Sequence, residues 1–218
     1  MRRKLGSIAA VIALAATSAL AQGLKDVSLP APRTEGGKPL LQALKERQSS
    51  RAFSDRALPP QLLSDLLWAA AGINRPDAGK RTAPSARDWQ EVEVYAVLRD
   101  GAYLYDAKAN LLRAVAAGDL RPATGVQGFV AVAPLDLVYV ADVTKMTGSA
   151  PEDQALYSGA DTGFISENVY LFCASEGLAT VVRGSIDRAA LAAALKLPET
   201  KRVMLSQTVG YPGSAAGE

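Results

Sequence analysis

Hydrophobic residues recur at intervals of three or four in the first third of the chain, and this spacing predicts two helices. The first spans residues 39–48 and carries three leucines on one face. The second begins at Pro59-Pro60 and ends at Gly72. Its apolar stripe comprises Leu62, Leu63, Leu66, Leu67 and Ala70.

The pattern then changes to that of strands. Apolar and polar residues alternate over residues 92–99, which predicts a strand. Asp100-Gly101 is a typical turn pair, so residues 102–105 are expected to return as the second strand of a hairpin. Residues 135–143 are apolar except for two aspartates, which is typical of a central strand buried on both faces.

Near the C-terminus, helices and strands alternate. Residues 164–175 are apolar almost all the way round, which predicts a buried helix that ends at Gly177. Residues 178–182 are expected to form a strand, residues 186–195 a helix and residues 203–209 the last strand. This imperfect alternation, with one hairpin and no internal repeat, favours an α+β sandwich over a barrel or a doubly wound sheet.

The N-terminus has the features of a secretory signal peptide. Three basic residues precede an apolar stretch over residues 8–20, and Ala19-Leu20-Ala21 provides a small-x-small cleavage site. The stretch is short and rich in alanine, which favours cleavage over a permanent membrane span. We therefore expect residues 1–21 to be removed on export to the periplasm. Residues 22–38 are interpreted as an extended arm or linker, and residues 39–218 as one folded domain.

Composition excludes several classes of enzyme. The 218 residues are 49% hydrophobic, enough for one sizeable core. No histidine is present and Cys173 is the one cysteine, so a Ser-His-Asp triad, a Cys-His pair and a histidine or thiolate metal site are excluded. A net charge of +2 gives no footprint for nucleic acid. Neither a G-x-x-x-x-G-K-[ST] nor a G-x-G-x-x-G motif occurs.

Three polar segments could carry chemistry. In the first, Arg47, Ser49 and Arg51 follow a helix, and their donors suit a phosphate. A solvated basic helix end is the alternative. The second is the loop over residues 81–90, which precedes a strand and is either a binding loop or a simple connection. In the third, Arg183-Gly184 ends a strand, where glycine would let the backbone approach a flat ligand, unless it only forms a turn.

Together these segments resemble the nitroreductase family. Arg47-Gln48-Ser49-Ser50-Arg51 followed by Phe53 is similar to the segment that opens the family domain. Ala83-Pro84-Ser85-Ala86 and Gln90 resemble a flavin-contacting loop, although members often carry Asn at Asp88 and Pro at Glu91. The likeness covers roughly residues 39–212, and residues 92–106 look like the branch that contains the thiazoline/oxazoline oxidases. The order and spacing of the motifs make the match specific.

The resemblance implies a homodimer of α+β sandwiches, each with a mixed, mostly antiparallel central sheet flanked by helices, and one FMN at each of two subunit interfaces. It implies an FMN-dependent oxidoreductase that works by ping-pong hydride transfer between small molecules, with nitroaromatic, quinone or azoline-like substrates. The flavin supplies the chemistry, so no catalytic side chain and no metal are expected. The implied contacts are Arg47, Ser49 and Arg51 at the phosphate and ribityl end, Pro84, Ser85, Asp88 and Gln90 along the ring or ribityl chain, and Arg183 and Gly184 near N5.

A second hypothesis is a non-catalytic exported module that kept the fold and lost the flavin. Asp88 supports it, since a carboxylate beside the ring would repel the anionic reduced flavin. In addition, the chain after Pro212 contains no lysine or arginine, whereas many relatives close a basic tail over the phosphate. Arg47 and Arg51 would then hold the phosphate alone.

Export predicts that the mature chain begins at Gln22. N-terminal sequencing of protein recovered from a cell-envelope fraction is expected to find that end. An intact Met1 on cytoplasmic protein would contradict export.

Overall fold

One antiparallel sheet lies between two layers of helices in the computed structural model of the protein, which describes residues 23–213. The sheet has the strand order β1-β6-β5-β4-β7-β9-β8. Its strands are β1 (Val27–Ser28), β4 (Val92–Val97), β5 (Gly101–Asp106), β6 (Leu111–Ala117), β7 (Leu135–Asp142), β8 (Ala179–Arg183) and β9 (Lys201–Gly210). A separate hairpin joins β2 (Ile73–Arg75) and β3 (Lys80–Arg81).

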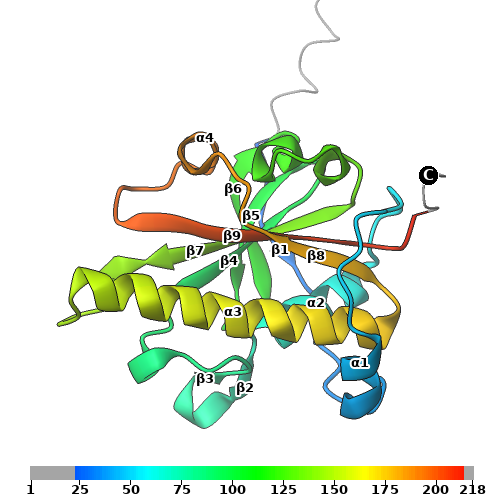
Figure 1. Cartoon of the computed structure of the whole chain (residues 1–218), viewed down its shortest axis with the longest axis horizontal. Coiled ribbons are helices and arrows are strands. Elements are labelled where there is room, and N and C mark those ends of the chain that lie inside the picture. The colour runs from blue at the N-terminus through cyan, green and yellow to red at the C-terminus, as the bar shows by residue number, and fades with distance from the viewer. Residues whose placement is uncertain (1–22, 214–218) are drawn as a thin grey trace, which may run out of the picture.

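The helices are α1 (Leu40–Glu46), α2 (Pro60–Ala71), α3 (Pro151–Glu176) and α4 (Arg188–Ala194). Figure 1 shows α3 running across one face of the sheet, with α1 near its C-terminal end, and α4 on the opposite face. The predicted α+β sandwich is confirmed. Every pairing among the described strands is antiparallel, so the sheet is not mixed within residues 23–213.

Strand β7 is the centre of the core, as its apolar run predicts. Leu137 and Tyr139 pack in the layer of α2 and α3, while Val138 and Val140 pack against Leu191 of α4. All four are fully buried. Burying a side chain of this size contributes roughly 1.5–3 kcal/mol, so both faces of the strand hold the two layers together.

The predicted second helix and hairpin are found with small shifts at their ends. The apolar stripe of α2 is buried at Leu63, Leu66 and Leu67. The helix ends at Gly72, where the ring of Trp68 fills the space that a Cβ would need. In the hairpin, Val97 of β4 pairs with Ala102 of β5.

The predicted buried helix over residues 164–175 is wrong in length and in burial. It is the C-terminal half of the 26-residue α3, which begins at Pro151. Only the side facing the sheet is covered, so Ile165 is buried while Phe164 is 47% exposed. The start of α3 was missed because residues 151–163 are mostly small or polar and show no apolar period. Gly177, in the left-handed conformation at φ 69°, ends the helix as predicted.

The arm before α1 crosses the surface of the domain in extended form. Its β1 pairs with β6, and the Ser64 hydroxyl donates to the Pro30 carbonyl at 2.6 Å. Residues 1–22 and 214–218, which include the predicted signal peptide and the C-terminal tail, lie outside the described residues. Among residues 23–213 no helix is both long and apolar enough to cross a membrane.

Candidate functional site

The segment that follows α1 lies against the start of β8. The Ser50 N–H donates to the Thr180 carbonyl at 2.9 Å, and Phe53 forms an isolated bridge with Pro212. These contacts place residues 45–48 and Ser50 along one wall of a pocket of about 520 Å³. The C-terminal turns of α3 and the first residues of β8 form the other wall. We call this the α1–β8 pocket.

Tyr170 of α3 organises this wall, and the sequence patterns did not single it out. Its hydroxyl accepts the Val182 N–H at 2.9 Å and lies 2.8 Å from the Ser49 hydroxyl. The Arg47 guanidinium lies 5.3 Å from the centre of its ring. A tyrosine inside a largely apolar helix needs a hydrogen-bond partner for its hydroxyl. This requirement is the sequence feature that could have identified Tyr170.

Arg47 and Arg51 form neither an ion pair nor a side-chain hydrogen bond with any residue of the described range 23–213. The neighbouring Glu46 is already bonded to Lys38 at 2.6 Å and to Gln42 at 2.9 Å. Two guanidinium groups without carboxylate partners, four residues apart, suit an anion with several oxygens. The donor set therefore fits the phosphate of FMN.

The basic pair Lys201-Arg202 is distant from these arginines along the sheet. Lys201 starts β9 and pairs with Glu93 at 2.6 Å, whereas Gly210 at the other end of the strand pairs with Ala179 of β8. A strand of ten residues spans roughly 30 Å. Lys201 therefore cannot assist Arg47 and Arg51.

The second group of predicted residues lies in the loop between β3 and β4. This loop lines a different pocket, of about 490 Å³, which we call the loop 84–90 pocket. Its predicted lining residues are Pro84, Ser85, Asp88 and Gln90, and its basic ones are Arg75, Lys80, Arg81 and Arg87. The two pockets share no lining residue, so one chain does not bring all predicted residues together.

The backbone of this loop is strained. Arg87, Asp88 and Gln90 have φ angles of 49°, 58° and 48°. The left-handed region costs roughly 1–2 kcal/mol per residue for most side chains. Three such residues within four positions are typical of a functional loop held by its surroundings.

Asp88 does not present an unpaired charge in this pocket. Lys80 pairs with its Oδ2 at 2.9 Å, and the Gln90 amide donates to its Oδ1 at 3.0 Å. Hydrogen bonds from Gln90 and Lys80 lower the pKa of the Asp88 carboxyl. Lys80 offsets part of the Asp88 charge, and basic residues outnumber Asp88 in the lining of the pocket. The repulsion expected between Asp88 and a reduced flavin stays a prediction.

The side chain of Arg183, expected near a ligand, is buried on the α4 face of the sheet. It forms an ion pair with Asp136 of β7 at 2.8 Å and donates to the Thr124 carbonyl at 3.0 Å. The guanidinium lies so close to Gly125 that no Cβ would fit there. Its role is thus internal. The sequence pattern of one strand does not reveal on which face of the sheet a charged residue at its end lies.

Burial dominates the electrostatics of this pair. It raises the pKa of Asp136 to about 7, although Thr208 and Arg183 oppose the shift, and it lowers the pKa of Arg183. Within the described residues, Asp136 Oδ2 and Arg183 Nε have no hydrogen-bond partner. The pair joins β7 and β8 to the turn before Gly125.

Gly184 follows Arg183 and is exposed. A Cβ added there would meet only a methyl group of Leu205, at 3.7 Å, which is ordinary contact. Packing within the described chain does not require glycine at this position. Its small size leaves the backbone open from outside, as the approach of a flat ligand would need.

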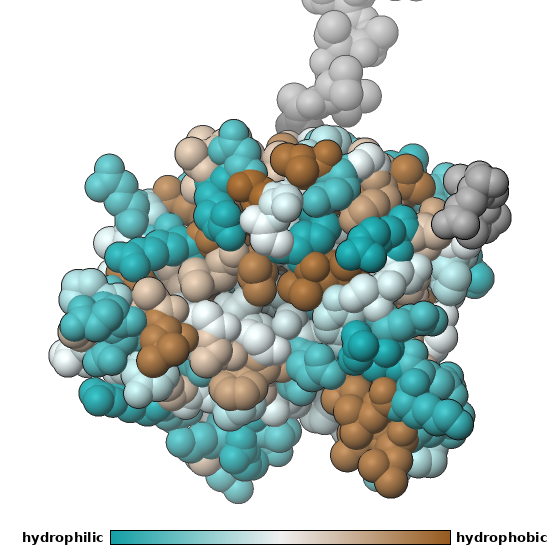
Figure 2. Space-filling model, in the orientation of Figure 1, coloured by the Kyte–Doolittle hydropathy of each residue, from teal (hydrophilic) through white to brown (hydrophobic). Residues whose placement is uncertain are grey.

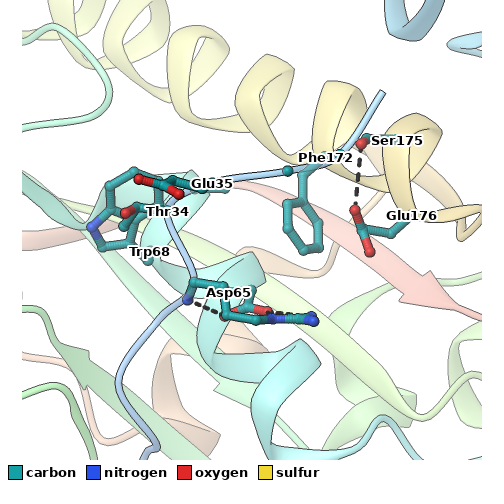
Figure 3. Close-up of a pocket in the computed structure, with 11 residues that line it drawn as sticks. Thr34, Glu35, Asp65, Trp68, Phe172, Ser175 and Glu176 are labelled. Atoms are coloured by element: carbon teal, nitrogen blue, oxygen red, sulfur yellow. Dashed lines mark hydrogen bonds and ion pairs between the residues drawn. The ribbon is translucent and has the colours of Figure 1, made fainter. Parts of the chain in front are cut away.

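A further pocket of about 300 Å³ contains none of the predicted residues (Figure 3). It lies between the arm, α2 and α3, beside Trp68 and Phe172. Its polar groups largely satisfy one another: Arg33 pairs with Asp65 at 2.8 Å, and Ser175 bonds to Glu176 at 3.4 Å. We assign no chemistry to it.

Comparison with known proteins gives one consistent family. Residues 44–211 match the model of the nitroreductase family. The chain is 30% identical over 166 residues to a protein of Methanocaldococcus jannaschii provisionally named a nitroreductase, covering 72% of this chain and 83% of that protein.

Solved structures share the fold. A protein of Ralstonia eutropha, also provisionally named a nitroreductase, is 44% identical, with a TM-score of 0.84 over 88% of this chain and 91% of the other. The NADPH:FMN oxidoreductase of Vibrio harveyi, solved with NAD+, is 20% identical, with a TM-score of 0.59 over 79% of this chain and 68% of the other.

Replacing Arg183 by alanine should strongly destabilise the chain, because Asp136 would remain buried without its cation. We expect a loss of about 3–5 kcal/mol in the free energy of unfolding, measured by urea denaturation at about pH 8. Arg113→Ala is the control, since its pair with Asp106 lies at the surface and is expected to contribute less than about 1 kcal/mol. Equal losses in the two variants would contradict the buried role.

Proposed function

The chain belongs to the nitroreductase family, and from this we propose that it is an FMN-dependent oxidoreductase that holds the flavin phosphate between Arg47 and Arg51. The observation that carries the proposal is the pair of guanidinium groups that have no carboxylate partner within residues 23–213. Arg47 lines the α1–β8 pocket and lies over Tyr170, whose hydroxyl contacts Ser49, and Arg51 follows four residues later in the same segment.

Bound FMN would supply the redox chemistry, taking a hydride from a donor and passing it to a small acceptor such as a nitroaromatic, quinone or azoline-like compound. The chain supplies binding and electrostatics. Tyr170 contacts the Ser49 hydroxyl, and its ring packs against the Arg47 guanidinium. These two contacts orient hydrogen-bond donors near the α1–β8 pocket. The exposed backbone of Gly184, just after β8, would allow the flat ring of the flavin to approach closely.

The loop 84–90 pocket adds positive charge. Arg75, Lys80, Arg81 and Arg87 line it against one carboxylate, Asp88. Such a pocket favours a ligand that gains negative charge on reduction, as a flavin does. This observation favours the enzyme over the non-catalytic module, which is supported by the carboxylate at position 88 and by the lack of basic residues after Pro212. The absorption spectrum of the purified protein discriminates between them.

We further propose that the complete site needs two chains. The predicted residues divide between two pockets of one chain, and a partner's loop 84–90 could complete the α1–β8 pocket. Leu40, Leu41 and Leu44 of α1 are 63%, 79% and 47% exposed. Figure 2 shows them as a brown patch where Figure 1 places α1. An apolar patch of this kind is typical of a subunit interface.

Export to the periplasm is also part of the proposal. It bears on the electron donor, because soluble NAD(P)H is not expected outside the cytoplasm. Anaerobic reduction of the holo-protein with a panel of donors would identify the class that serves it.

Replacing Arg47 or Arg51 by alanine should weaken FMN binding by roughly tenfold to a hundredfold, since each removes a charge-assisted contact. Fluorescence titration of FMN into apo-protein measures the dissociation constant. Arg99→Ala, at an exposed position outside both pockets, is the matched control and should leave the constant unchanged. Unchanged affinity in both test variants would mean that the segment is only a basic helix end.

Replacing Leu41 by aspartate should weaken dimerisation and lower FMN occupancy together, because a charge would then lie in the proposed interface. Sedimentation velocity reports the first effect and absorbance the second. Val132→Asp, an exposed apolar position outside α1, serves as the control. A wild-type holo-protein that sediments as a monomer would rule out the two-chain site.

A further inference from the structure

A pair of buried carboxyl groups lies directly behind the strained loop. Glu91, at the start of β4, is fully buried, and Asp161 of α3 is 3% exposed. Both side chains bond to the same short stretch of the loop, at residues 85 and 86. Within the described residues, Glu91 Oε1 has no hydrogen-bond partner.

Each carboxyl group holds a different part of the loop. Asp161 Oδ2 accepts the Ala86 N–H at 2.9 Å. Glu91 Oε2 lies 3.3 Å from the Ser85 hydroxyl, whose oxygen accepts the Gln90 N–H at 2.8 Å. The left-handed residues at positions 87, 88 and 90 thus lie within the stretch whose two ends the pair holds.

No lysine or arginine of the described chain forms an ion pair with either carboxyl group. The charged groups on the surrounding elements have other partners. Lys80 forms an ion pair with Asp88. Both Lys145 and Lys201 pair with Glu93, and Lys201 also approaches Asp142. Arg81 donates to Gln90, and Arg87 lies over the ring of Trp89, which in turn contacts Tyr157. A second negative charge in the pair would therefore be uncompensated.

We propose that Glu91 and Asp161 are positioning residues that hold the loop 84–90 in its strained form while Glu91 carries a proton. This rests on the proposed function, in which the loop forms one wall of the flavin site. In that state a neutral Glu91 accepts the Ser85 hydroxyl, and Asp161 accepts the Ala86 N–H. Loss of the proton leaves a buried charge on Glu91 with no cation beside it, and the loop relaxes.

The electrostatics agree with this arrangement. Burial raises the pKa of Glu91 most strongly; a backbone hydrogen bond opposes the shift, the charge of Asp161 adds to it, and the Ser85 hydroxyl opposes it. Because the folded chain then binds a proton that the unfolded chain releases, this contribution to stability is complete below the unfolded pKa of Glu91. It is lost as the pH rises toward the folded pKa.

The test follows the loop without relying on activity. Amide exchange of Ala86 and Gln90 in the wild-type apo-protein, corrected for intrinsic rates, is measured by NMR from about pH 5 to about pH 9, above the ordinary range of a glutamate. We expect protection of both amides to fall by about tenfold or more as Glu91 ionises, and the ¹³C shift of its carboxyl group to report the same transition. Protection of Val138, inside β7, should stay constant.

Two variants separate this role from a merely structural one. Glu91→Gln keeps a neutral side chain at this position and should retain protection of both amides at every pH. Asp161→Ala removes the acceptor and should expose the Ala86 amide across the whole range. Two results would overturn the proposal. One is protection of Ala86 and Gln90 that does not change with pH in the wild type; the other is titration of Glu91 in the ordinary glutamate range.

FMN affinity distinguishes this inference from the proposed function. A dissociation constant that rises with pH in the wild type, and not in Glu91→Gln, supports both. If the amides respond to pH but FMN does not bind at all, the proposed function fails and the positioning role of the pair stands. If FMN binds equally tightly while the loop opens, the pair does not serve the flavin site.

Discussion

The burial of β7 on both faces is the constraint on which the rest of the structure depends. Because Leu137 and Tyr139 face one layer and Val138 and Val140 the other, α2 and α3 must cover one side and α4 the opposite side. This arrangement sets α3 across the sheet, and α3 brings Tyr170 to β8 and Asp161 to the loop before β4. Both candidate pockets are therefore positioned by a single helix that packs across several strands of the sheet.

The same burial explains why most polar groups of the sheet are hydrogen-bonded in sets. A buried polar group without a partner costs roughly 1–3 kcal/mol, so few are left unpaired; Asp136 Oδ2 and Arg183 Nε are exceptions within the described residues. Tyr139 donates to Gln207 at 2.5 Å, and Asp136 accepts from Arg183 and Thr208. The second set includes Arg183, which directly precedes Gly184. Its interior polar contacts therefore anchor the end of β8.

Long apolar patterns were enough to predict the central strand, α2, the first hairpin and the last strand, because burial itself produces those patterns. They failed for α3, where only one side is covered: Phe164 looks like its buried neighbour Ile165, and the polar first half shows no period. The site residues Arg47, Ser49 and Arg51 could be found from their donor chemistry. Tyr170 and the inward turn of Arg183 could not, because both depend on contacts between segments far apart in the chain.

The strained loop shows how these contacts are used. Each left-handed residue raises the energy of the loop by roughly 1–2 kcal/mol relative to an ordinary turn, so bonds from outside the loop must hold it. They come from three elements: Lys80 and Arg81 of β3, Asp161 of α3, and Glu91 at the start of β4. A glutamate at position 91 is a costly choice for a purely structural contact, since an apolar or proline residue would avoid burying an acid. The buried acid makes the conformation of the loop depend on a proton, which links the wall of the proposed flavin site to the pH of the compartment in which the protein works.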